Sequence, residues 1–154
     1  MTGEPGIRPT AEDADMRKQY HFWPGRHGVD AWDVDRLIEL GRDLPVDAIP
    51  VGDICEVDSV YWFDDWHRPT VRSVVEHWQL MQATDLAYPV ILGPDGRVMD
   101  GMHRIARALV EQRSTIDAVR FLVLPPADHL DCRPQDLPYD RSSDNDDGGS
   151  GSGG

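Results

Sequence analysis

The clearest pattern of apolar and polar positions in the chain is the helical one that follows Pro69. Apolar side chains recur there at intervals of three and four residues, which places them on one face of a helix. They are Val71, Val74, Val75, Trp78, Leu80 and Met81. Pro69 and Thr70 suit the start of a helix, because proline lacks the N–H that a first turn leaves unpaired. The pattern predicts a helix from Pro69 to about Thr84 that packs near the rest of the fold.

A second, denser pattern runs from Tyr88 to Leu124 and predicts a strand-turn-strand-helix-strand unit. The short apolar run Tyr88–Leu92 is followed by Gly93-Pro94-Asp95-Gly96, a tight-turn signal, and then by Arg97-Val98-Met99, which we expect to pair back. Gly101 lets the backbone turn into a helix from Met102 to about Gln112. We expect the inward side chains of that helix to be Ile105, Ala106, Ala108 and Leu109.

The strand after this helix is expected near the centre of the sheet. Residues Ile116 to Leu124 are apolar at both odd and even positions, except at Asp117 and Arg120, as in a strand covered on both faces. Pro125 and Pro126 end it. Beyond them, residues 134–139 are expected to lie as extended chain on the surface.

The first half of the chain has weaker patterns. Residues 21–28 carry aromatic anchors and two glycines, and Asp30 is then expected to cap a helix that ends at Gly41. Val34, Leu37 and Ile38 share a face of that helix. Residues 46–54 alternate as in a strand, which Pro50 restricts to an edge or a kink. Residues 61–67 form an aromatic and acidic loop.

The length of 154 residues and an apolar content of 40% suit one modest core, so we expect one domain over residues 21–141. Residues 1–20 mix glycine, proline and charge, and are expected to be a flexible lead. Residues 142–154 contain only Ser, Asp, Asn and Gly, and are expected to be a disordered tail.

The net charge of −13 makes DNA an unfavourable partner. Three of those charges belong to Asp144, Asp146 and Asp147 in the tail, which leaves −10 on the rest. An acidic surface repels a phosphate backbone. The two cysteines, Cys55 and Cys132, form neither a zinc set nor a disulfide framework and are expected to be inert. Without a membrane-spanning run or a signal peptide, the expectation is a cytoplasmic protein with no membrane partner.

Candidate chemistry gathers at the turn from Asp100 to Arg104. The first N–H groups of a helix are unpaired and lie at the positive end of its dipole, so they favour an anion. His103 and Arg104 can converge there on a phosphate or carboxylate, and Asp100 can hold a metal ion or a hydroxyl group. The alternative is that His103 and Arg104 are exposed helix residues paired with Asp100 or Glu111.

The same segment resembles the ParB/sulfiredoxin superfamily over about a third of the chain. The residues that carry the resemblance are Tyr88-Pro-Val-Ile-Leu, then Asp95-Gly-Arg-Val-Met-Asp-Gly-Met-His-Arg-Ile-Ala-Arg-Ala-Leu, and Ile116-Asp-Ala-Val-Arg. Gly101, His103 and Arg104 occupy the positions of that family's Gly-x-His/Arg-Arg motif at the start of an alanine-rich helix. The resemblance implies an α/β (α+β) fold with a small mixed sheet and packed helices.

The activities in this superfamily differ, so each is weighed against the residues present. Sulfiredoxin-type chemistry needs a cysteine where this chain has Met102, and a thioether cannot act as the nucleophile. The partition proteins add a DNA-binding domain, for which this chain has neither the length nor the charge. The free serine kinases place a Glu shortly after the first strand as a base, and Glu56 stands at a similar place.

The resemblance thus implies a nucleotide (ATP, ADP or CTP) with Mg²⁺, bound at Gly101, Met102, His103 and Arg104. Glu56 and Asp100 are the expected catalytic residues of a small-molecule phosphotransferase or nucleotide hydrolase. Glu56 can equally be a solvated loop carboxylate. The alternative function is a non-catalytic ligand-sensing or partner-binding module that meets another protein through the acidic aromatic loop. Nuclease action is a third and weaker reading, given the charge.

The remaining aromatic and histidine residues have two readings each. Trp62, Trp66 and Trp78 can stack on a base, or they can anchor the core and its loops. His67 and His77 lie near Asp64, Asp65 and Glu76, but their spacing matches no recognised metal site, so no protein-held metal is expected.

Overall fold

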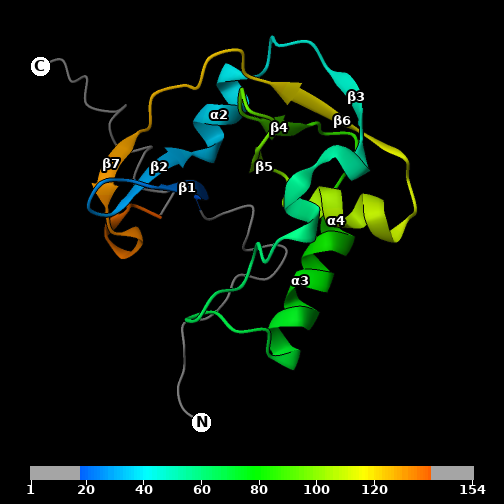
Figure 1. Ribbon diagram of the computed structural model, residues 1–154. Helices are drawn as coiled ribbons and strands as arrows, with labels where there is room; N and C mark the ends of the chain where they lie inside the picture. Colours follow the sequence, from blue (N-terminus) through cyan, green and yellow to red (C-terminus); the bar gives the residue numbers. More distant parts are fainter. Residues whose placement is uncertain (1–17, 140–154) are drawn as a thin grey trace, which may run out of the picture. The chain divides into compact units, whose positions relative to one another are not determined.

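The computed structural model of the chain describes residues 18–139 (Figure 1). Almost all of the expected lead, residues 1–17, and the expected tail lie outside the described residues. The described part forms two compact units. One comprises residues 18–35 and 127–139, and the other comprises Arg36–Pro126. The expectation of one domain over residues 21–141 stays a prediction, and each unit is described by itself.

The fold is mixed α and β, as the sequence predicts, and its larger unit is built on a four-stranded sheet. The strands stand in the order β3-β6-β4-β5. Their bounds are β3 Asp47–Pro50, β6 Thr115–Arg120, β4 Val90–Leu92 and β5 Val98–Asp100. Strands β4 and β6 run parallel, whereas β3 pairs with β6 and β4 pairs with β5 in antiparallel fashion. The sheet is therefore mixed, with β6 in its interior and the proline-containing β3 at its edge.

The helices α3 and α4 of this unit differ in how they bury their apolar side chains. Helix α4 (Met102–Val110) buries Met102, Ile105 and Ala108. These join a cluster that is drawn from β4, β5, β6 and the short 3-10 helix η1 (Val51–Asp53), and that contains Val51, Ile54, Val90, Leu92, Val98, Ile116 and Ala118. Leu109, which was expected to face inward, is 45% exposed and lies outside this cluster.

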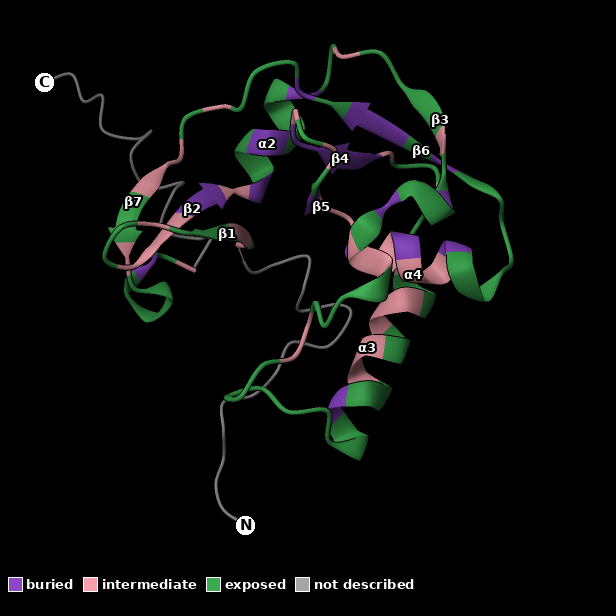
Figure 2. Ribbon diagram, viewed as in Figure 1, coloured by how far each residue is buried: buried purple, intermediate pink, exposed green. Residues whose placement is uncertain are grey.

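Helix α3 (Val71–Ala83) begins where the sequence predicts, since the Thr70 hydroxyl accepts a hydrogen bond from the N–H of Ser73. Its apolar stripe does not point into the core. Val71, Val74, Val75 and Trp78 are all exposed, whereas Ser73 is buried. Figure 2 shows α3 mostly in the colours of exposed and intermediate residues, in contrast to β4, whose three residues are all buried. The helical period was predicted correctly, but an apolar stripe does not by itself identify the buried face.

Strand β6 is shorter than the sequence predicts, and it is not buried on both faces as expected. It ends at Arg120, and its residues alternate between exposed and buried except at Ala118 and Val119, which are both buried. Leu122 and Val123 are 88% and 80% exposed in the segment that follows. Helix α4 likewise ends at Val110, two residues before the predicted end.

The smaller unit holds a three-stranded antiparallel sheet in the order β1-β2-β7. Its strands are β1 Tyr20–Pro24, β2 Val29–Asp33 and β7 His129–Cys132. The sequence analysis missed all three, and the predicted cap Asp30 lies within β2. Helix α2 (Val34–Leu40) begins four residues after Asp30, with the Asp33 carboxylate accepting from the N–H of Asp35. It ends before Gly41, as predicted.

The segment expected to be extended, residues 134–139, contains a short 3-10 helix, η3 (Pro134–Asp136). The prediction failed there because the N–H groups of Asp136 and Leu137 bond back to the carbonyls of Arg133 and Pro134.

Candidate functional site

The turn between β5 and α4 depends on a glycine. Gly101 has φ +111° and ψ 20°, a left-handed conformation at the start of α4. A Cβ atom at this position would lie 2.7 Å from Cγ1 of Val90, which is too close for any other residue. Gly101 is therefore required both by the backbone conformation and by the close approach of β4. The first hydrogen bond of α4 runs from the N–H of Ile105 to the carbonyl of Gly101.

Arg104 is committed to contacts inside the protein. Its Nη1 donates to the carbonyls of Tyr88 and Pro89 at 3.0 Å each, and its Nη2 donates to Oδ2 of Asp100 at 2.7 Å. The Arg104 and Asp100 side chains are only 15% and 16% exposed. The Arg104 side chain thus ties the chain before β4 to the turn, and its charge is balanced by Asp100. For Arg104, the structure supports the alternative of pairing with Asp100.

His103 is not an exposed helix residue, and it does not act as a cation. Its Nε2 lies 2.8 Å from Nδ1 of His77 on α3, and both imidazoles stack on the indole of Trp62, with centroids 4.6 Å and 4.4 Å from it. Burial, reinforced by His77, lowers the pKa of His103 to about 4. The imidazole is therefore neutral at pH 7, and its Nε2 faces His77.

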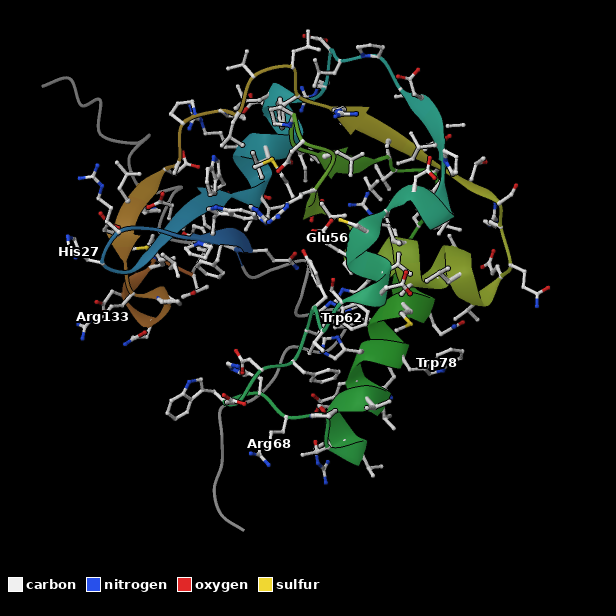
Figure 3. All side chains as sticks on the ribbon, in the orientation of Figure 1. His27, Glu56, Trp62, Arg68, Trp78 and Arg133 are labelled. Atoms are coloured by element: carbon white, nitrogen blue, oxygen red, sulfur yellow. The ribbon has the colours of Figure 1, made fainter. Side chains whose placement is uncertain are left out.

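These three rings form a histidine–tryptophan clasp, defined by Trp62, His77 and His103, that joins three separate segments. The interplanar angle of 17° between the imidazoles and their centroid separation of 5.1 Å place them edge to edge, with the indole over both. In Figure 3 Trp62 lies beside α3, while Trp78 projects from the other side of this helix. Of the two readings of these tryptophans, Trp62 follows that of a structural anchor.

Glu56 lies in the 3-10 helix η2 (Cys55–Asp58) and is held by the backbone of β5. Its Oε1 and Oε2 accept from the N–H of Val98 at 3.0 Å and 3.2 Å. Burial raises the pKa of Glu56 above its usual value, although the Val98 hydrogen bond and Arg97 oppose that shift. The Glu56 carboxylate is thus positioned by the same strand that ends in Asp100.

Both predicted catalytic carboxylates influence the pKa of Tyr61. Burial raises the pKa of Tyr61 to about 12, and the charges of Glu56 and Asp100 add to the effect. Both carboxylates therefore lie within electrostatic reach of the Tyr61 hydroxyl, which stays protonated at neutral pH and can donate a hydrogen bond. Tyr61 was not among the site residues predicted from the sequence.

A cavity of about 540 Å³ opens beside this group, between the loop after η2 and helix α4. The aromatic wall is formed by Tyr61, Trp62 and Phe63, and α4 contributes Met102, Ile105, Ala106 and Leu109. Three carboxylates also line the cavity, those of Glu56, Asp64 and Asp65. Among the predicted site residues, Glu56 and Met102 line it, whereas Asp100, Gly101, His103 and Arg104 do not.

The acidic aromatic loop that forms one wall is internally braced. Asp64 accepts from the N–H groups of Trp66 and His67 at 2.8 Å and 2.6 Å, and contacts Nδ1 of His67 at 3.1 Å. These hydrogen bonds lower the pKa of Asp64. Trp66, at the tip of the loop, is 89% exposed. The loop therefore has a fixed carboxylate at its base and a large apolar side chain in solvent.

A second hollow, of about 480 Å³, lies at the other end of α4 and is more basic. It is lined by Thr84, Asp85, Leu86, Ala87, Arg107 and Arg113. Both arginines bind Glu111, at 2.8 Å and 2.9 Å, and they lower its pKa. Because Glu111 balances one of the two charges, this hollow is a weaker anion site than its arginines alone would make it.

The described residues contain no group of three or more His, Cys, Asp or Glu side chains placed to hold a metal ion. Cys55 and Cys132 are both free thiols, and Cys55 is exposed. A magnesium ion that arrives with a nucleotide could still meet the carboxylates of the cavity. For the phosphates, the structure offers the first-turn N–H groups of α4, because the two side chains expected to help are paired with other residues.

The clasp and Tyr61 were missed because no sequence spacing connects them. Trp62, His77 and His103 come from a loop and two helices, and only their packing brings the rings together. The one available signal was His77 itself, a polar residue next to the apolar side chains of α3.

Comparisons with protein-family models, with curated proteins and with solved structures found no match to this chain. None of the helices within residues 18–139 has the length and apolar character needed to cross a membrane.

Proposed function

We propose that this chain is a nucleotide-binding protein of the ParB/sulfiredoxin type that transfers a phosphoryl group to a small molecule or hydrolyses the nucleotide. The observation that carries the proposal is a cavity that reaches the first turn of α4 and is lined by Glu56, whose carboxylate the Val98 N–H holds in place. A cavity of this size suits a small-molecule substrate.

The phosphate end of the nucleotide is assigned to the first turn of α4. Its unpaired N–H groups and the positive end of the helix dipole favour an anion. His103 is neutral and Arg104 is balanced by Asp100, so the charge on the phosphates must be offset by Mg²⁺ bound with the nucleotide. Gly101 and Met102 shape this turn, since Gly101 allows the backbone to approach β4 closely.

Glu56 is assigned the role of the base that takes a proton from the attacking hydroxyl group. A base works best when its pKa lies close to the working pH, and burial moves the pKa of Glu56 in that direction. The Val98 N–H fixes the orientation of the carboxylate. Tyr61 lines the same cavity, and its hydroxyl is assigned the role of holding the substrate oxygen. The two free cysteines are consistent with a cytoplasmic location, which belongs to the same proposal.

A thermal-shift screen with ATP, ADP and CTP, each with and without Mg²⁺, tests the proposal. A ligand at about 100 times its dissociation constant adds roughly 2.7 kcal/mol to stability, which gives a clear rise in Tm. We expect a nucleotide to raise Tm only when Mg²⁺ is present. If no nucleotide does so, the proposal is wrong.

The variant Glu56→Gln separates binding from chemistry. Its amide oxygen can still accept from the Val98 N–H, so the fold is preserved, but the amide cannot take a proton. We expect turnover to be lost while the nucleotide-induced shift in Tm remains. The matched control is Glu39→Gln on the exposed surface of α2, which should leave turnover unchanged.

The second candidate is a ligand-sensing or protein-binding module without catalysis. It is favoured by the internal pairing of Arg104 and by the exposed Trp66 at the tip of the acidic aromatic loop. Two results together would favour this module over the enzyme. The wild-type protein would bind a nucleotide without any turnover, and a partner protein that binds the wild-type protein would no longer bind the Trp66→Ala variant.

A further inference from the structure

The charged side chains that line the cavity beside Tyr61 are all of one sign. Of the described residues that line it, Glu56, Asp64 and Asp65 are acidic, and none is Lys, Arg or His. A nucleotide phosphate placed in the body of this cavity would meet only negative charge. The phosphates therefore belong at the turn of α4, and the cavity itself is left for a group of the opposite sign.

The aromatic wall of the cavity also favours a positively charged ligand. Tyr61 and Trp62 meet nearly at right angles, with an interplanar angle of 85° and a centroid separation of 6.3 Å, so their rings form a corner. The face of an aromatic ring carries partial negative charge and attracts a cation. An aromatic corner with nearby carboxylates is the arrangement that recognises organic ammonium groups.

Two of the three acidic groups, Glu56 and Asp64, are held in place by hydrogen bonds before a ligand arrives. The Glu56 carboxylate is held by the Val98 N–H, and the Asp64 carboxylate is held by the N–H groups of Trp66 and His67. A pre-organised site loses little freedom on binding. The remaining lining from α4, at Met102, Ile105 and Ala106, is apolar and suits a hydrocarbon body.

We propose that this cavity binds an organic cation, a small molecule with an ammonium group and an apolar body. The ammonium would lie against Tyr61 and Trp62 within reach of the carboxylates, and the apolar part would lie along α4. The role of this molecule as the second substrate rests on the proposed phosphotransferase function. Its binding to the cavity does not depend on that function.

A series of ligands with one shape and three charges tests the inference. Choline is the cation, 3,3-dimethylbutan-1-ol is its uncharged counterpart, and 3,3-dimethylbutanoate is the anion. Each is titrated into the full-length ¹⁵N-labelled protein without nucleotide, and the Trp62 indole and Ala106 amide signals are followed by NMR. We expect the cation to bind about tenfold more tightly than the neutral compound, and the anion to bind most weakly.

Three variants locate the binding. Asp65→Asn removes a charge from the rim and Tyr61→Leu removes one wall of the corner, so each should weaken choline binding several-fold. Asp117→Asn removes the same charge from the exposed side of β6, outside the cavity, and should have no effect. Equal binding of the cation and the neutral compound would overturn the inference, as would tightest binding of the anion.

These results can be separated from those for the nucleotide. If choline binds as described but no nucleotide raises Tm, the cation site stands and the proposed function fails. If a nucleotide raises Tm but the charge series shows no preference for the cation, the proposed function stands and this inference fails.

Discussion

Gly101 is the residue on which the geometry of the candidate site depends. Substitution by alanine forces a side chain into a left-handed backbone conformation and places its Cβ 2.7 Å from Cγ1 of Val90. We expect Gly101→Ala to lower the free energy of unfolding by about 3 kcal/mol, from backbone strain and overpacking together. Urea unfolding followed by circular dichroism measures this change.

Gly52 provides the matched control for that substitution. Nothing lies within 4 Å of a Cβ atom built on Gly52, so Gly52→Ala should change stability by less than about 1 kcal/mol. Equal losses for the two variants would show that the turn at Gly101 is less constrained than the structure indicates.

His103 gives stability a dependence on pH. Its pKa is about 4 in the folded protein against 6.5 for an unperturbed histidine, because burial disfavours the charged form. The contribution of neutral His103 to the stability of the folded protein is fully present above pH 6.5. It is lost as the pH falls toward 4, since the unfolded chain then binds a proton that the folded protein does not. Between pH 7 and pH 5 we expect a loss of about 2 kcal/mol.

The comparison with His103→Phe isolates this contribution. Phenylalanine keeps an aromatic ring against Trp62 but does not titrate, so the drop in stability between pH 7 and pH 5 should shrink. His67→Gln, at an exposed loop position, should keep the full drop. A wild-type profile that is flat between pH 7 and pH 5 would contradict the clasp.

At the scale of elements, loss of an aliphatic side chain should destabilise the protein much more in α4 than in α3. Ile105 on α4 is fully buried, so Ile105→Ala should cost about 2–5 kcal/mol. Val75 on α3 is 48% exposed, and Val75→Ala should cost less than about 1 kcal/mol. Chemical denaturation of both variants under one condition provides the test. A cost at Val75 as large as that at Ile105 would mean that the apolar face of α3 is covered in solution.

The elements that the sequence predicts well are those with local signals. Pro69 and Thr70 predict the start of α3, and the Gly93–Gly96 turn predicts the hairpin of β4 and β5. Both signals are local because particular residues favour the backbone conformations that a helix start and a tight turn require. The orientation of α3 could not be predicted in this way. Which side of a helix is buried depends on what packs against it, and here the clasp draws the polar side of α3 toward α4.

The strands β1, β2 and β7 were not predicted, although β1 and β2 form a local hairpin, and only the pairing of β2 with β7 is non-local. Strand β7 pairs with β2 about a hundred residues earlier, and neither alternates clearly enough in sequence to be recognised as a strand. In the candidate site, Glu56 could be named from a resemblance, whereas Tyr61 required the three-dimensional neighbourhood of Glu56 and Asp100.

At the scale of the whole molecule, the first and last described segments form one unit, and this organisation can be tested by shortening the chain. A chain that ends at Pro126 lacks β7, and it also lacks Tyr139, whose ring contacts that of Tyr20 at a centroid distance of 5.3 Å. Strand β2 would then keep only β1 as a partner, and an isolated two-stranded hairpin is marginal in water.

We expect hydrogen exchange to report this loss in one unit only. In the chain that ends at Pro126, the amides of β1 and β2 should lose protection, whereas those of β4 and β6 should keep it, because the partners of these strands all lie within Arg36–Pro126. A chain that lacks only residues 142–154 is the control and should exchange like the full-length protein. Loss of protection in β6 as well would show that the two units unfold together and that the chain behaves as the single domain its length predicts.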